Sequence, residues 1–164
     1  MIEKTYPVTE QLILNALQLA QQLHLELTQE ADTLKKTPQA EQIITIAANK
    51  KQLVAQLDQF NAQLAQVLAT EKLSNGQESI KEYFKRAETA GLSPAASISN
   101  WAQLMLICAE CRDLNEQNGA GVDLLSRHTK RSLDILKGKP DSANTYGSDG
   151  SAQSDRYSHS LISV

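Results

Sequence analysis

Residues 43–67 read IITIAANKKQLVAQLDQFNAQLAQV, and this stretch decides the fold class of the chain. Its apolar side chains recur at alternating steps of three and four, at Ile43, Ile46, Leu53, Leu57, Phe60, Leu64 and Val67. Such an a/d seam predicts a long helix with coiled-coil packing. Lys50 is the one polar residue on the seam. It either fixes the register of the packing or buries only its methylene stem while its ammonium reaches water.

The first half of the chain favours two long helices, because residues 1–75 contain no glycine. The segment from Thr5 to Thr9 offers cap candidates for the first helix. Its apolar stripe consists of Leu12, Ala16, Leu19, Leu23, Leu27, Ala31 and Leu34. Thr37 is the expected N-cap of the second helix, with Pro38 at its first position, where a missing N–H costs nothing. The connection is short, so we expect antiparallel neighbours.

The second half is expected to add a short helix and a third long one. Asn75-Gly76 supplies a left-handed stop for the second helix, and residues 77–90 form a short helix that ends at Gly91. Ser93-Pro94 starts the third helix, which continues in phase across two further glycines, straight or bent at that point, to Gly138-Lys139-Pro140. Its apolar positions are Ile98, Trp101, Leu104, Met105, Cys108, Cys111, Leu114, Val122, Leu125, Leu133 and Leu136.

These patterns predict an all-α fold. We expect an antiparallel coiled-coil-like bundle of three long helices plus a short helix over residues 1–138, followed by a disordered tail over residues 139–164. The composition agrees, since the chain is rich in Leu, Ala and Gln and only 4% of its residues are aromatic. A sheet-based core would require alternating β-branched and aromatic residues, so a sandwich or barrel is disfavoured.

Charge and hydropathy narrow the partners and the compartment. The formal net charge is −3, which leaves no general basic surface for a phosphate backbone, so nucleic acid is not an expected partner. No stretch approaches 18 uncharged apolar residues and the N-terminus lacks a signal peptide pattern, so we expect no membrane insertion. Two cysteines fit a reducing compartment. A cytoplasmic protein is therefore predicted.

The residues give little support for catalysis or for a cofactor. Cys108-x-x-Cys111 has the spacing of zinc and thiol redox sites, but both cysteines fall within a helical apolar stripe, and the three histidines are distant in sequence. We interpret the cysteines as small buried hydrophobic residues, with a redox or metal-binding protein as the alternative. The chain has no Glu-x-x-His motif, phosphate loop or nucleophile elbow. We expect no enzyme activity, no cofactor and no metal.

Three local patterns resemble the FlgN family of flagellar type III export chaperones. The first is Lys50-x-x-Leu53-x-Ala55-x-Leu57-Asp58, which is similar to the family's second helix. The second is the segment 112–119, RDLNEQNG, which is close to a Leu-Asn-x-x-Asn-Gly signature. The third is the tail, where residues 145–150 read TYGSDG and the chain ends Ile162-Ser163-Val164.

This resemblance implies a function and two sets of site residues. Members of the family escort the hook-filament junction proteins FlgK and FlgL, whose terminal amphipathic helices polymerise, and deliver them to the export gate protein FlhA. The implied client-binding residues are Asn115, Asn118, Gly119, Val122, Leu125, Leu133 and Leu136. The implied gate-docking residues are Tyr146, Gly147, Asp149 and Gly150.

Alternatives remain for both the site and the function. Leu133 and Leu136 either bind a client or complete the core of the bundle. The heptads around Lys50 would equally build a homodimer, which would make the protein a helical scaffold or adaptor with no role in export.

Overall fold

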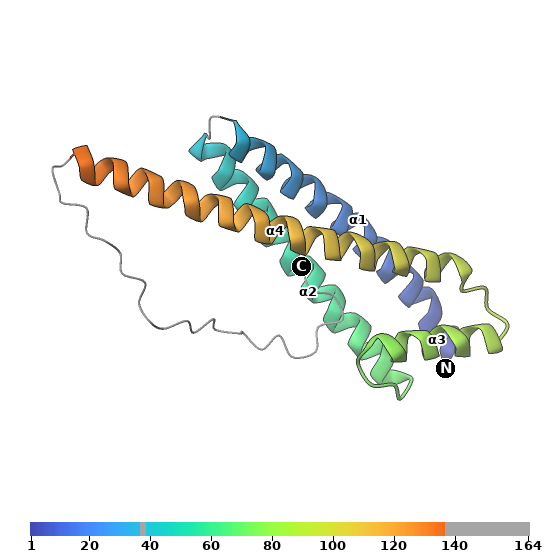
Figure 1. The fold of residues 1–164 in the computed structure, drawn as a ribbon. Coiled ribbons are helices and arrows are strands. Elements are labelled where there is room, and N and C mark those ends of the chain that lie inside the picture. Colours follow the sequence, from blue (N-terminus) through green and yellow to red (C-terminus); the bar gives the residue numbers. More distant parts are fainter. Residues whose placement is uncertain (37–38, 137–164) are drawn as a thin grey trace.

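The computed structural model describes residues 1–36 and 39–136, and all regular structure in these ranges is helical (Figure 1). The helices are α1 (Ile2–Lys35), α2 (Ala40–Thr70), α3 (Gln77–Thr89) and α4 (Ala95–Leu136). The predicted all-α fold of three long helices and one short helix is confirmed. The predicted tail, residues 139–164, lies outside the described residues together with Tyr146, Gly147, Asp149 and Gly150.

Helices α1 and α2 form an antiparallel hairpin, as their short connection predicts. At one end of the hairpin, Thr5 Oγ1 donates a hydrogen bond to Glu71 Oε1 at 2.7 Å. Towards the other end, Asn49 Nδ2 donates to Glu26 Oε1 at 3.1 Å. The apolar seam of α2 is buried in this hairpin at Ile46, Leu53, Leu57, Phe60, Leu64 and Leu68. The seam therefore ends on Leu68, while the predicted end members Ile43 and Val67 are only half-buried.

Helix α4 packs along α1 and runs parallel to it. Three contacts join residues that are each 91 positions apart: Tyr6 with Ser97, Ala20 with Cys111, and Leu27 with Asn118. A constant sequence offset of this kind is the signature of a parallel pair. Figure 1 shows the cause, because α3 carries the chain across the base of the hairpin before α4 begins beside the start of α1. The antiparallel arrangement thus holds for α1 and α2 but not for α1 and α4.

A polar network fixes α3 to this base. The Tyr83 hydroxyl is fully buried and lies 2.9 Å from Thr9 Oγ1 and 3.1 Å from Thr5 Oγ1. Arg86 Nη1 donates to the carbonyl oxygen of Glu71 at 3.0 Å. The predicted apolar face of the short helix is confirmed, since Ile80, Tyr83, Phe84 and Ala87 are all buried.

Several helix ends differ from the predicted ones. Helix α1 begins at Ile2, so the cap candidates from Thr5 to Thr9 lie inside the helix, where the Thr9 hydroxyl bonds back to the carbonyl of Thr5. Helix α2 begins at Ala40 with Gln39 as N-cap, and Thr37-Pro38 lies outside the described residues. Its other end comes before Asn75-Gly76, at a left-handed Lys72 with φ of 58°, and Gly76 instead precedes α3. Gly91 ends α3 as predicted.

The stripe of α4 is buried in its first half and differs from the prediction near its start. Leu104, Cys108 and Cys111 are buried, whereas Ile98 is 45% exposed. Ser97 takes the inward position instead, because its hydroxyl bonds the buried Tyr6 hydroxyl at 3.0 Å. The helix continues unbroken through both glycines to Leu136, and the predicted stop at Gly138-Lys139-Pro140 lies outside the described residues.

Candidate functional site

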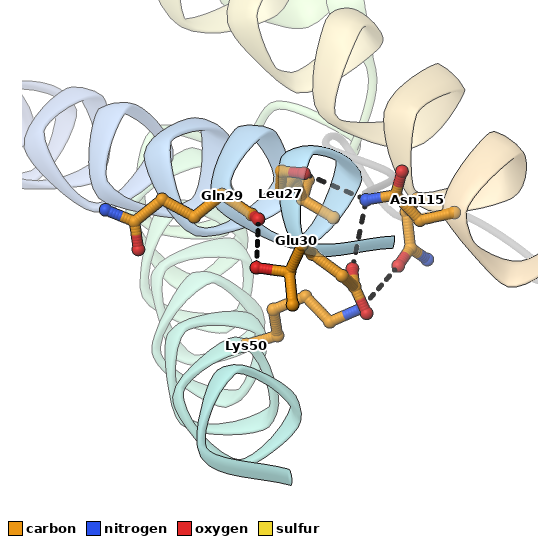
Figure 2. Close-up of polar contacts among 7 residues, drawn as sticks. Leu27, Gln29, Glu30, Lys50 and Asn115 are labelled. Atoms are coloured by element: carbon orange, nitrogen blue, oxygen red, sulfur yellow. Dashed lines mark hydrogen bonds and ion pairs between the residues drawn. The ribbon is translucent and has the colours of Figure 1, made fainter. Parts of the chain in front are cut away.

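The three long helices meet at the buried carboxylate of Glu30 on α1, which pairs with Lys50 of α2 and accepts a hydrogen bond from Asn118 of α4 (Figure 2). We call these three residues the polar junction. Lys50 Nζ lies 3.0 and 2.8 Å from the two carboxylate oxygens of Glu30. Asn118 Nδ2 donates to Glu30 Oε2 at 3.0 Å and to the carbonyl oxygen of Leu27 at 2.9 Å. One carboxylate thus binds donors from both neighbouring helices.

The hydrogen bonds of the polar junction matter for stability because Glu30 and Asn118 are buried. Glu30 and Asn118 are each only 4% exposed. A buried carboxylate is tolerated only when it is paired and hydrogen-bonded. The ammonium of Lys50 therefore pairs with a buried carboxylate, which differs from the alternative prediction that it reaches only water. Its Nζ also donates to Asn115 Oδ1 at 3.1 Å.

Glu30 is the member of the polar junction that the sequence analysis missed. It follows Leu27 by three residues and so lies in phase with the buried face of α1. The predicted apolar stripe continued through Ala31 and Leu34, and it therefore missed the direction of the buried face at this end of α1. Both of these residues are half-buried, whereas Glu30 is buried. The available signal was the presence of Glu30 on one seam and Lys50 on the next, since a charge on one apolar face requires a partner on the other.

Beyond the polar junction, α4 extends past the end of α1. Leu34 Cδ1 lies 3.6 Å from the position that a Cβ would occupy on Gly121, and α1 ends one residue later at Lys35. Figure 1 shows the remainder of α4 projecting beyond the α1–α2 hairpin. Val122, Leu125, Leu133 and Leu136 continue the face that Leu104, Cys108, Cys111 and Asn118 present to α1, because the same helical spacing is maintained.

The exposure of this continued face, which we call the distal face, rises along the helix. Val122 and Leu125 are half-buried, Leu133 is 47% exposed and Leu136 is 83% exposed. The prediction that Leu133 and Leu136 are candidates for a binding surface is therefore compatible with their positions, and they do not complete the core.

The same segment carries further exposed apolar residues that the sequence analysis did not select. Leu124 and Ile135 are 64% and 65% exposed. They are eleven residues apart and share a side of the helix roughly opposite the distal face, at about 100° per residue. The pairs Leu124-Leu125 and Ile135-Leu136 were the available signal, because adjacent apolar residues make a helix apolar on more than one side.

The seven predicted client-binding residues thus fall into three groups. Asn118 is buried and bonds α1, whereas Asn115 is exposed and its side-chain oxygen accepts a hydrogen bond from Lys50. Gly119 is exposed with open space around it, and the other four residues form the distal face. Asn118 is not accessible to a client in this conformation.

Cys108 and Cys111 are free thiols buried against α1. Burial raises the pKa of both to about 12, and the Sγ of Cys111 lies 3.7 Å from the carbonyl oxygen of Ala20. The interpretation of these residues as small buried hydrophobes is confirmed. Within residues 1–36 and 39–136, no group of three or more His, Cys, Asp or Glu side chains is arranged to hold a metal ion.

Comparisons with known proteins identify the family. No helix in the described part of the chain combines the length and the apolar character needed to cross a membrane. Neither the comparison with curated proteins nor the comparison with solved structures gives a match. The family model described as FlgN protein matches residues 2–154. The chain therefore belongs to the FlgN family, which is a family of flagellar export chaperones.

Proposed function

We propose that this protein is a cytoplasmic chaperone that binds the C-terminal amphipathic helices of the hook-filament junction proteins FlgK and FlgL. Binding keeps these helices from assembling prematurely, and the complex is delivered to the export gate protein FlhA. The observation that carries the proposal is the distal face, which continues the buried α1-facing side of α4 beyond the end of α1.

The geometry of the distal face suits a helical client. The constant offset of 91 places the end of α1 level with Ser126, and from there to Leu136 the helix rises about 15 Å, or roughly three turns. A client helix lying in line with α1 would cover this length, with apolar side chains at steps of three and four facing Leu133 and Leu136, and its end would reach the half-buried Val122 and Leu125. Covering Leu133 and Leu136 would contribute about 1–2 kcal/mol each from the removal of apolar area from water.

Docking on the export gate is assigned to the segment Tyr146-Gly147-Ser148-Asp149-Gly150. The support comes from sequence alone, since this segment lies outside the described residues. A tyrosine offers a large contact area with few rotatable bonds to fix. If the segment orders only on binding, the contact stays weak enough for release during export.

One assay with crossed variants tests both assignments. We expect Leu133→Asp/Leu136→Asp to abolish retention of the FlgK and FlgL C-terminal helices and to leave binding to FlhA intact. Tyr146→Ala should do the reverse. Retention and FlhA binding are measured by calorimetry on each purified variant.

The matched control is Val8→Asp/Leu25→Asp, which adds the same charge at two α1 side chains that are 52% and 58% exposed. The control should retain both clients. If the control loses the clients as fully as the distal-face variant does, or if Tyr146→Ala removes client and gate together, the proposal is wrong.

The scaffold or adaptor alternative rested on the heptads of α2. That seam packs within the chain against α1, with Leu57 and Leu64 almost completely buried, so it no longer argues for a homodimer through α2. Sedimentation of the full chain with and without client measures self-association directly.

A further inference from the structure

We propose that the polar junction positions residues 112–121 of α4 on α1. It thereby holds the distal face in line with α1 for a client. This inference rests on the proposed function for its consequence, but the positioning itself is testable without a client. Glu30, Lys50 and Asn118 are positioning residues in this scheme and do not touch the client.

The first argument is the distribution of apolar contact along α4. In the N-terminal half of α4, the α1-facing residues Leu104, Cys108 and Cys111 are 0–3% exposed. From Arg112 to Gly121, Asn118 is the only buried residue, and Leu114 is half-buried. Attachment of this segment to α1 thus depends on the hydrogen bonds of Asn118 far more than on apolar burial.

The second argument is the directional character of those bonds. Asn118 donates to a backbone carbonyl of α1 and to the carboxylate of Glu30, whose other donor, Lys50, comes from α2. A shift of α4 by one residue would rotate Asn118 by about 100° and leave Glu30 with one donor fewer. Leaving a buried polar group unsatisfied is costly, whereas an apolar contact tolerates sliding. Single polar residues on helical seams fix register for this reason.

The chain offers a matched control for the polar junction. Glu26 lies one turn before Glu30 on α1, and its carboxylate accepts a hydrogen bond from Asn49 of α2 at 3.1 Å. This pair joins the same two helices at an exposed position. Glu26→Gln therefore tests the loss of an α1 carboxylate without disturbing the contact between Asn118 and α1.

The experiment is amide hydrogen exchange on the full-length protein, read separately for residues 112–121 and for residues 77–89. We expect Asn118→Leu, which has a similar shape, to accelerate exchange in 112–121 by about tenfold and to leave 77–89 unchanged. Asn118→Asp should accelerate it further, because it places a second carboxylate beside Glu30. Glu30→Gln/Asn118→Asp should restore part of the protection, because the glutamine amide can donate to the introduced carboxylate, while the hydrogen bond to the Leu27 carbonyl stays lost. Glu26→Gln should behave as the unmodified protein does.

Binding of a FlgK C-terminal peptide is then measured on the same proteins, and affinity should fall and recover in the same order. Unchanged exchange in Asn118→Leu, or an equal acceleration in residues 77–89, overturns the inference whatever the peptide does. An unmodified protein that does not bind the peptide refutes the proposed function, and the exchange data still decide the positioning role.

Discussion

At the scale of single residues, burial changes what a side chain does. Cys108 and Cys111 have the spacing of a reactive pair, yet α1 covers them and raises the pKa of each thiol from 9.0 to about 12. The thiolate is the reactive form of cysteine. At pH 8 each buried thiol should therefore hold roughly a thousandfold less thiolate than a free one. The Cys-x-x-Cys pattern in this helix is a packing feature.

The corresponding prediction concerns pH and thiol chemistry. We expect negligible labelling of the folded protein by iodoacetamide at pH 8 and rapid labelling of both thiols in denaturant. The unfolded chain releases these protons near pH 9, whereas the folded chain retains them to about pH 12. The contribution of the two thiols to the free energy of unfolding is therefore fully present below pH 9 and is lost as the pH rises towards 12. Urea midpoints between pH 7 and pH 10 measure how the free energy of unfolding changes with pH. The variant Cys108→Ala/Cys111→Ala should show a smaller change. Fast labelling of the folded protein would contradict the assignment.

At the scale of elements, two helices end in the same backbone motif with different residues in the left-handed position. Lys72 holds a φ of 58° after α2, where the Leu73 amide bonds the carbonyl of Leu68 at 2.8 Å. Gly91 holds a φ of 81° after α3, where the Leu92 amide bonds the carbonyl of Ala87 at 3.0 Å. Glycine adopts this conformation without strain, whereas a residue with a Cβ does not.

Substitutions at these two positions should therefore have opposite signs. Lys72→Gly is expected to stabilise the protein by about 0.5–1 kcal/mol, and Gly91→Ala to destabilise it by a similar amount. A Cβ on Gly91 would meet no atom within 4 Å, so the cost at that site is one of backbone conformation alone. Urea unfolding of the two variants checks both values. The same sign for both variants would show that local contacts outweigh the backbone term.

The sequence predicted the elements well where apolar spacing and packing agree. The seam of α2 and the short helix α3 are examples, since both faces are buried nearly as expected. The pattern failed where a hydrogen bond decides which residue turns inward. Ser97 replaces Ile98 because it meets the Tyr6 hydroxyl, and Glu30 is buried because it meets Lys50 and Asn118. Those partners lie on other helices, so the pattern of one helix alone does not reveal them.

At the scale of the whole molecule, the direction of α4 was not predictable from its own residues. An apolar stripe fits a parallel or an antiparallel neighbour equally well, and the choice depends on how α3 crosses the base. The parallel arrangement has a consequence for the candidate site. Because α1 and α4 start together and α4 is longer, 42 residues against 34, the end of α4 projects beyond α1 and carries Leu133 and Leu136, the exposed part of the distal face.

The molecule should therefore divide into a folding part and a binding part within one helix. The buried apolar core ends on α4 at Cys111, and the last buried side chain in the described part of the helix is Asn118. Of the residues after Gly121 whose burial the structure describes, the apolar ones are exposed or half-buried, and none belongs to that core. The loss of such surface costs little stability, because most of it remains in contact with water in the folded chain.

Two truncations test this division. A chain ending at residue 121 should melt cooperatively within a few degrees of the full protein, on the scale of a change below about 1 kcal/mol, and should no longer bind FlgK or FlgL helices. A chain ending at residue 138 should melt in the same range and retain the clients, while losing FlhA because Tyr146 is absent. Thermal unfolding followed by circular dichroism and calorimetric titration measure both properties. If the chain ending at residue 121 lost its cooperative transition, the distal face would belong to the core; if it still bound clients, the binding surface would lie elsewhere on the bundle.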